Sequence, residues 1–329
     1  MLYWWFARDA SRRGMARSTS LRTMMGYLVP YVLIATFQFQ VAKDALNYSS
    51  PFVLMGLRYL VASSLIFGIV RRFRPILNKD TVLLSLFTCA SAGLWGLGLE
   101  YVSPAESAVL SYSMPLISIP ISWAILSEKA TTNEWGGAVV GLLGVLIYSL
   151  PFAYHALTAL GGVLTLMNAF FWGMYTVYYR KLKNQEPATT VATQLMLAGI
   201  VFLFLAPLDY RLVVAPSFWF DLAYLSILSG AVSFYLWNTM ARLQKIGKTA
   251  TLIYSIPVTA TFLQFVVSSV MPDPLSLIGI CLMIFGIYIS RIEQKKVTNY
   301  HSSPSTAAST TASRLTDFER TSKVKGPNI

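Results

Sequence analysis

The sequence predicts an all-α membrane protein with ten transmembrane helices, arranged as two inverted five-helix repeats. Of its 329 residues, 55% are hydrophobic and only 12% are charged, whereas a soluble domain has about 25% charged residues. The apolar residues fall into ten long runs that are separated by short polar gaps. Lys and Arg gather in every other gap. Composition, run length and charge placement therefore agree on a chain that crosses a bilayer repeatedly.

Each apolar run approaches the roughly 20 residues that a helix needs to cross the hydrocarbon core of a bilayer. In chain order, the predicted spans are 24–42, 51–70, 81–100, 105–126, 134–151, 160–180, 189–208, 218–241, 249–270 and 274–291. Prolines, which begin or interrupt helices, lie in most of the gaps. The division between the third and fourth spans depends on a single step, Ser103-Pro104.

The basic residues orient these spans, because Lys and Arg are enriched in cytoplasmic loops. With the basic segment 1–23 placed inside, alternating spans assign 23 of the 26 basic residues to the cytoplasmic side. Lys43 and Arg211 then lie outside. We therefore predict that both termini are cytoplasmic, with a disordered Ser/Thr-rich tail at 292–329. Since the positive charges lie between apolar runs, we expect the lipid bilayer as a partner and not a nucleic acid.

The two halves, 24–151 and 160–291, share a pattern of residues at a constant offset. An offset of 142 pairs Ser91, Trp95, Tyr112, Pro115, Gly137 and Gly144 with Ser233, Trp237, Tyr254, Pro257, Gly279 and Gly286. Because each half has an odd number of spans, the second half must enter the membrane from the opposite side. The charges agree, since Glu100, predicted outside, aligns with Arg242, predicted inside.

Four stretches of the sequence occur in the order and spacing of one known family. They are Gly56 to Tyr59, Ser107 to Glu128, Gly136 to Gly144, and Gly230 to Pro257. Together they resemble the EamA group of the drug/metabolite transporter superfamily. The resemblance implies a secondary transporter of small metabolites such as amino acids, often a plasma-membrane exporter, that works by alternating access. One departure is Val270, where the second repeat lacks an acidic residue equivalent to Glu128.

Polar side chains inside a bilayer are costly and tend to face a cavity or another helix. Arg58 lies several residues into its span, roughly 10 Å below the boundary. It would bind an anionic group of the substrate, pair with Glu100 or Glu106, or clamp neighbouring helices. Its counterpart in the second repeat is Gln194.

Further candidates for substrate binding are polar or aromatic residues inside the spans. They are Gln38, Gln40, Trp95, Asn168, Trp172, Tyr175 and Trp237. The resemblance adds that the first helix of each repeat lines the central cavity. Packing between helices is the alternative role for the tryptophans.

Pro115 and Pro257 lie inside predicted spans, where a proline removes a backbone hydrogen bond and permits a hinge or a static kink. The glycines of the last span in each half allow close packing, either within the chain or across a homodimer.

Several chemistries find no support in the sequence. Cys89 and Cys281 lie in separate apolar runs, so we expect no metal site, disulfide or cofactor. A Walker-type loop and a nucleophile–base pair are both missing, so neither ATP hydrolysis nor an enzyme is expected. Two other functions stay open. A sugar-phosphate or nucleotide-sugar translocator would need several basic residues at the cavity. A non-transporting membrane assembly or lipid-modifying protein would need a catalytic cluster at one interface, and a tightly packed centre without a polar cavity would favour it.

Overall fold

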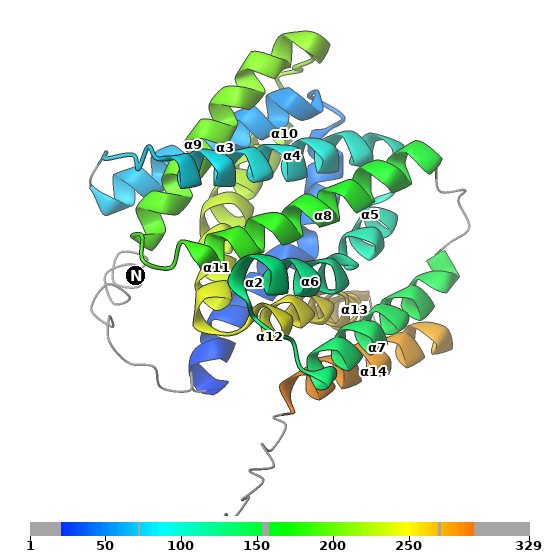
Figure 1. The fold of residues 1–329 in the computed structure, drawn as a ribbon. Helices are drawn as coiled ribbons and strands as arrows, with labels where there is room; N and C mark the ends of the chain where they lie inside the picture. The colour runs from blue at the N-terminus through cyan, green and yellow to red at the C-terminus, as the bar shows by residue number, and fades with distance from the viewer. Residues whose placement is uncertain (1–20, 72, 153–157, 269–270, 293–329) are drawn as a thin grey trace, which may run out of the picture. The chain divides into compact units, whose positions relative to one another are not determined.

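The computed structural model describes most of the predicted membrane domain. The described residues are 21–71, 73–152, 158–268 and 271–292. Nearly all of the predicted segment 1–23 and of the predicted tail 292–329 lies outside them. The described part of the chain is helical, and its one β-bridge joins Ser49 to Leu212. Figure 1 shows the helices as a layered bundle.

The first repeat folds into helices that follow the predicted spans. They are α2 (Leu21–Ala45), α3 (Pro51–Val70), α4 (Lys79–Tyr101), α5 (Pro104–Ser111), α6 (Met114–Leu126) and α7 (Thr132–Ser149), followed by the short η1 (Leu150–Phe152). Pro51 and Pro104 open their helices, at positions where a missing N–H has no intrahelical partner to lose. Asn78 caps α4 by accepting a hydrogen bond from Thr81 N at 2.8 Å. Local residues therefore set where these helices begin.

The second repeat is less regular than the sequence predicts. Its elements are α8 (Ala159–Lys181), α9 (Pro187–Leu205), η2 (Ala206–Asp209), α10 (Pro216–Ala223), η3 (Tyr224–Val232), α11 (Ser233–Leu243), α12 (Ile246–Ala250), η4 (Thr251–Tyr254), α13 (Ser255–Ser268) and α14 (Pro274–Arg291). The η3 segment is a π-helix and η4 is a 3₁₀ turn. Both interrupt stretches that the sequence predicts as continuous helices.

Eight helical stretches of the described residues are long and apolar enough to cross a membrane. They coincide with eight of the predicted spans. The fifth predicted span corresponds to α7, and the ninth corresponds to α12–α13. Both regions are helical, but neither combines the length and the hydropathy of the other eight. The count of ten membrane-spanning helices therefore stays a prediction.

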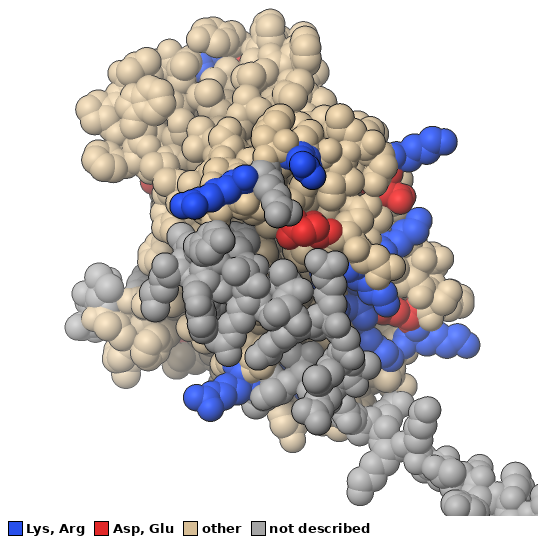
Figure 2. Space-filling view, turned by 90° about the vertical axis from the view of Figure 1, so that its left-hand side faces the viewer, with Lys and Arg blue, Asp and Glu red and all other residues tan. Residues whose placement is uncertain are grey.

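The surface of the bundle carries large apolar side chains that face outward. Phe204 and Phe220 are 81% and 77% exposed. Figure 2 shows one face on which several charged side chains gather along an edge beside a broad uncharged area. Such a surface is unfavourable in water but matches lipid. The chain is thus a multi-pass integral membrane protein.

The last helices of the two repeats, α7 and α14, lie side by side and antiparallel (Figure 1). A Cβ added at Gly137 would lie 2.5 Å from Gly286 O, and one at Gly144 would lie 2.7 Å from Gly279 O. The offset of 142 relates Gly137 to Gly279 and Gly144 to Gly286. Replacing each glycine by its equivalent therefore converts the Gly137–Gly286 contact into the Gly279–Gly144 contact. A two-fold axis between the two helices has this effect.

The predicted span 105–126 is broken at Tyr112 and Ser113, just before Pro115. Pro115 and Pro257 lie in the first turns of α6 and α13. A first-turn proline removes no intrahelical hydrogen bond. The two prolines thus begin a second helical segment instead of kinking a continuous helix, and a hinge at these points stays a prediction.

Candidate functional site

A cavity lies where helices of both repeats meet. Its volume, taken as the space that the centres of water molecules can reach, is about 80 Å³. One water needs roughly 10–15 Å³ on this measure, so the cavity has room for several waters or a small solute. Six of the residues predicted from the sequence line it: Gln38, Arg58, Trp95, Asn168, Trp172 and Trp237.

The remaining predicted residues lie outside the lining. Gln40 is exposed, and its Nε2 donates to Asp44 Oδ1 at 3.0 Å. Tyr175 and Gln194 are fully buried behind the wall. The Tyr175 hydroxyl accepts hydrogen bonds from Gln194 Nε2 at 2.8 Å and from Asn238 Nδ2 at 2.6 Å. Tyr175 thereby supports the cavity from behind.

Arg58 is the single charged residue among those that line the cavity, and it is 3% exposed. Its Nε donates to Leu225 O at 3.1 Å and its Nη2 to Ser229 Oγ at 2.8 Å. Ser229 in turn donates to Gln38 Oε1 at 2.9 Å. A chain of hydrogen bonds therefore connects α3, η3 and α2 at the cavity wall.

No carboxylate among the described residues forms an ion pair with Arg58. Glu100 Oε1 lies 4.0 Å from Arg211 Nη2, and Glu106 accepts from Ser103 N at 2.8 Å. The Arg58 guanidinium instead lies over the rings of Tyr59 and Trp95, each with its centroid 5.4 Å from Cζ. These rings compensate the charge only in part.

The π-helix η3 presents Leu225 O and Ser229 Oγ together to Arg58. The close turn depends on Gly230, because a Cβ there would lie 2.9 Å from Leu225 O and 3.0 Å from Ala62 Cβ. Short π-helical segments occur frequently at functional sites. In this chain the segment positions the two oxygens that hold the guanidinium in place.

Aromatic rings form most of the remaining wall. Trp172 stacks on Tyr175 with centroids 5.0 Å apart, and it meets Phe234 edge-on at 5.4 Å. Tyr31 packs against Trp237 at 5.2 Å. Asn168 bridges two serines, accepting from Ser91 and donating to Ser111. The wall therefore offers a flat apolar surface with a few fixed polar atoms.

Sequence reasoning misses several residues that line the cavity. Besides aliphatic positions, they are Tyr31, Phe39, Tyr59, Ser91, Ser111, Ser229, Ser233 and Phe234. Ser91 and Ser233 do carry a signal, because they lie one helical turn before the paired tryptophans and share the offset of 142.

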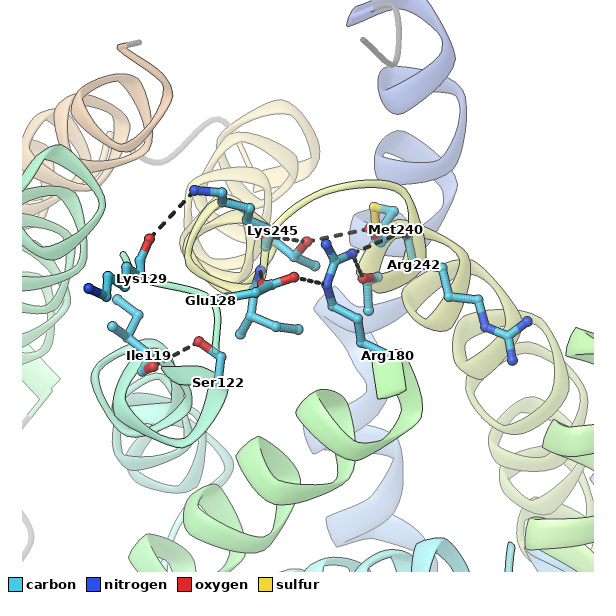
Figure 3. A network of polar contacts seen from close by, with 11 residues as sticks. Ile119, Ser122, Glu128, Lys129, Arg180, Met240, Arg242 and Lys245 are labelled. Carbon is cyan, nitrogen blue, oxygen red and sulfur yellow. Dashed lines mark hydrogen bonds and ion pairs between the residues drawn. The ribbon is translucent and has the colours of Figure 1, made fainter. Parts of the chain in front are cut away.

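A polar network joins the two repeats at the end of the bundle where α6 and α8 finish (Figure 3). Glu128 Oε1 accepts from Arg180 Nε at 2.5 Å, and Glu128 Oε2 accepts from Ile246 N at 3.2 Å. Arg180 Nη1 also donates to Ala241 O at 2.7 Å and to Arg242 O at 3.1 Å. Glu128 belongs to the first repeat, whereas its partners belong to the second.

The other end of the first repeat has a matching contact. Lys43, at the end of α2, donates to Leu99 O and to Glu100 O, the latter at 3.4 Å. These carbonyls are equivalent to those of Ala241 and Arg242 at the offset of 142. In each repeat, a cation at the end of the first helix therefore binds the carboxyl end of the third helix, where positive charge is favourable.

A duplicated bundle of apolar helices around a cavity with one buried cation defines this chain as a membrane transport protein. The sequence profile of the EamA-like transporter family matches residues 23–150 and 159–292, one copy for each repeat. The chain belongs to the EamA-like transporter family.

Curated relatives agree with this assignment. An uncharacterized transporter of Acidianus ambivalens is 42% identical over 241 residues, which cover 73% of this chain and 94% of the relative. A probable terminal-alkyne amino-acid exporter of Streptantibioticus cattleyicolor is 29% identical, over 67% of this chain and 75% of its own length. A probable amino-acid metabolite efflux pump of Salmonella typhimurium is 23% identical, over 80% of this chain and 94% of its own length.

A solved crystal structure shares the fold. It superposes with a TM-score of 0.71 and covers 83% of this chain and 98% of its own, at 19% sequence identity.

Proposed function

We propose that this protein is a secondary transporter that exports small metabolites, amino acids or related compounds, by alternating access. The observation that carries the proposal is a buried cation, Arg58, without an acidic partner among the described residues, in a cavity between two equivalent halves. A buried charge is unfavourable unless it is paired. An anionic group of the substrate would supply the missing partner.

Alternating access requires two halves that exchange roles, which an inverted repeat provides. The exchanged glycine contacts of α7 and α14 support this relation, because those two equivalent helices run antiparallel. The charge distribution supports ten spans with both termini cytoplasmic. The resemblance to exporters favours the plasma membrane as their location. In each orientation one half would open the cavity while the other closes it.

The substrate class rests on charge and on relatives. A translocator of sugar phosphates or nucleotide sugars would need several cations around the cavity, whereas Arg58 is the single one in its lining. Two relatives are named as an amino-acid exporter and as an amino-acid metabolite efflux pump. These observations favour a small carboxylate-bearing metabolite.

Counterflow in proteoliposomes tests the proposal, with labelled amino acids and related carboxylic acids as candidate substrates. Arg58→Gln should lower the flux of the transported compound by about 10- to 100-fold, the effect of losing a hydrogen-bonded charge. Arg211→Gln is the matched control, because Arg211 lies outside the cavity lining and binds Leu46 O. Undiminished flux in Arg58→Gln, or no flux of any candidate in the wild type, would contradict the proposal.

A further inference from the structure

We infer that the transported species is a small carboxylate with a single net negative charge and without an ammonium group, and not a zwitterionic amino acid. The inference rests on the proposed function and narrows its substrate class. Three observations carry it: the net charge of the cavity, its unused hydrogen-bond donors, and its occupied acceptors.

The net charge of the cavity is the first observation. Its lining contains Arg58 and no acidic residue among the described residues. A monoanion would neutralise this charge, whereas a zwitterion would leave a net positive charge in a medium of low dielectric constant. A dianion would leave a net negative charge. Neutrality of the complex therefore selects a single negative charge on the substrate.

Unused donors are the second observation. Among the described residues, Trp95 Nε1 and Ser233 Oγ are buried and have no hydrogen-bond partner, and both residues line the cavity. Buried polar groups are almost always hydrogen-bonded. Arg58 adds to this donor set, because its guanidinium carries five N–H groups and hydrogen bonds with described residues account for only three of them. A carboxylate, which only accepts hydrogen bonds, matches such a set.

The residues equivalent to Trp95 and Ser233 in the other repeat do have hydrogen-bond partners, so the fold can provide partners at these positions. Trp237 is equivalent to Trp95, and its Nε1 donates to Thr176 Oγ1 at 3.0 Å. Ser91 is equivalent to Ser233, and it donates to Asn168 Oδ1 at 2.8 Å. In each equivalent pair one member has a partner and the other does not. The two unpaired donors are therefore a specific property of this cavity.

Occupied acceptors are the third observation. An ammonium group needs acceptors or aromatic faces. The amide oxygens that line the cavity, Gln38 Oε1 and Asn168 Oδ1, already accept from Ser229 and Ser91. The rings of Tyr59 and Trp95 already lie against Arg58. Other aromatic rings of the lining are not in contact with Arg58, but an ammonium group there would share a medium of low dielectric constant with a like charge, and both amide oxygens already have a donor.

Three compounds with the same branched side chain separate the possibilities. They are 4-methylpentanoate, an anion; leucine, a zwitterion; and 3-methylbutylamine, a cation. Transport is measured in proteoliposomes at pH 8, with empty liposomes as the leak control. We expect 4-methylpentanoate to exceed leucine by about tenfold or more, the ratio given by one charged hydrogen bond, and the amine to match the leak.

Leucine transport equal to or faster than that of 4-methylpentanoate would overturn the inference and leave the proposed function standing. If the wild type transports none of the three, nor any compound of the wider counterflow set, the proposed function fails and the inference fails with it.

Two variants test the donors themselves. Trp95→Phe keeps an aromatic ring and removes the free N–H, so the preference for 4-methylpentanoate over leucine should fall by about tenfold. Trp123→Phe is the matched control, since Trp123 is 61% exposed and outside the lining. An unchanged preference in Trp95→Phe would contradict the assignment of this donor.

Ser233→Asp would add an acceptor and a negative charge to the cavity lining. If charge balance sets the selectivity, this variant should reverse the preference in favour of leucine. Thermal unfolding of the variant in detergent shows whether it is folded. A folded Ser233→Asp protein that still prefers 4-methylpentanoate would contradict the charge argument.

Discussion

At the scale of single residues, Tyr175 holds two amide side chains in place behind the cavity. Its hydroxyl accepts from Gln194 and Asn238, and its ring stacks under Trp172. Gln194 Oε1 and Asn238 Oδ1 have no hydrogen-bond partner among the described residues. The hydroxyl is therefore the single partner that secures each amide.

Tyr175→Phe should lower the free energy of unfolding by about 1–3 kcal/mol, because two buried amide groups lose their partner. Thermal unfolding in detergent measures the change. Tyr210→Phe is the control, since Tyr210 is 69% exposed. Replacing Asn238 by Leu as well should restore part of the loss, because an apolar pair leaves fewer unpaired groups. Equal unfolding temperatures for the wild type and Tyr175→Phe would contradict this role.

The residues of the cavity could be predicted where their type is unusual for a membrane span. Arg58 stands out as a charge in an apolar run. Gln38 and Gln40 cannot both face the cavity, because residues two apart in a helix differ by about 200°, and the structure places Gln38 there. Ser229 also lines the cavity, but serines are common in spans and bond to their own backbone, so the sequence does not single it out.

At the scale of helices, the contact between α7 and α14 depends on glycines that let the two backbones meet. A Cβ at Gly286 would lie 2.6 Å from Gly141 N, and a Cβ at Gly141 would lie 2.3 Å from the Tyr254 ring in η4. The five glycines predicted to mediate close packing, Gly137, Gly141, Gly144, Gly279 and Gly286, all have close neighbours within the chain. This face is therefore filled by the chain itself, and a homodimer would need another surface.

Gly137→Ala should destabilise the protein by about 1–3 kcal/mol, because the added methyl group would overlap the α14 backbone. Gly26→Ala is the matched control in α2, since nothing lies within 4 Å of its added Cβ. The control should keep or slightly raise the unfolding temperature, because alanine favours helix more than glycine does. Similar effects of both substitutions on thermal unfolding would show that the glycine contact is unimportant.

Helix starts could be predicted better than helix interiors. Prolines at Pro51, Pro187 and Pro274 fix the first turns of α3, α9 and α14 as the sequence indicates. The break at Tyr112 and the π-helix η3 could not be predicted, because hydropathy is uniform along these spans. A uniformly apolar stretch does not reveal whether its turns hold α, π or 3₁₀ hydrogen bonds.

At the scale of the whole molecule, Glu128 and Arg180 tie the two repeats together at one end of the bundle (Figure 3). In the proposed alternating-access cycle, opening the cavity at that end would separate α6 from α8 and from the α11–α12 turn. The Glu128–Arg180 pair would then break. The residue equivalent to Glu128 is Val270, which lies outside the described residues and carries no carboxylate.

Glu128→Gln should make the cavity more accessible from this end by about fivefold, since a partly exposed ion pair contributes about 1 kcal/mol. A single cysteine at Ala169, in a protein without Cys89 and Cys281, reports access through its labelling rate with an impermeant thiol reagent. Glu186→Gln is the control, because the carboxylate partners of Glu186 among the described residues are the backbone amides of its own helix α9. An unchanged labelling rate in Glu128→Gln would show that the Glu128–Arg180 pair does not hold this end of the cavity closed.

The π-helix beside Arg58 also bears on how such a chain can change over time. A π-helix accommodates one more residue than the α-helix of equal span, so η3 holds a surplus residue at a tolerated position. Deleting that residue would restore regular α-helical hydrogen bonding and leave α10 and α11 in their relative orientation. Ser233, Phe234 and Trp237 would keep their places at the cavity, whereas Leu225 O and Ser229 Oγ would no longer be presented together to Arg58. A single codon lost in this segment would thus release the guanidinium without rebuilding the rest of the wall.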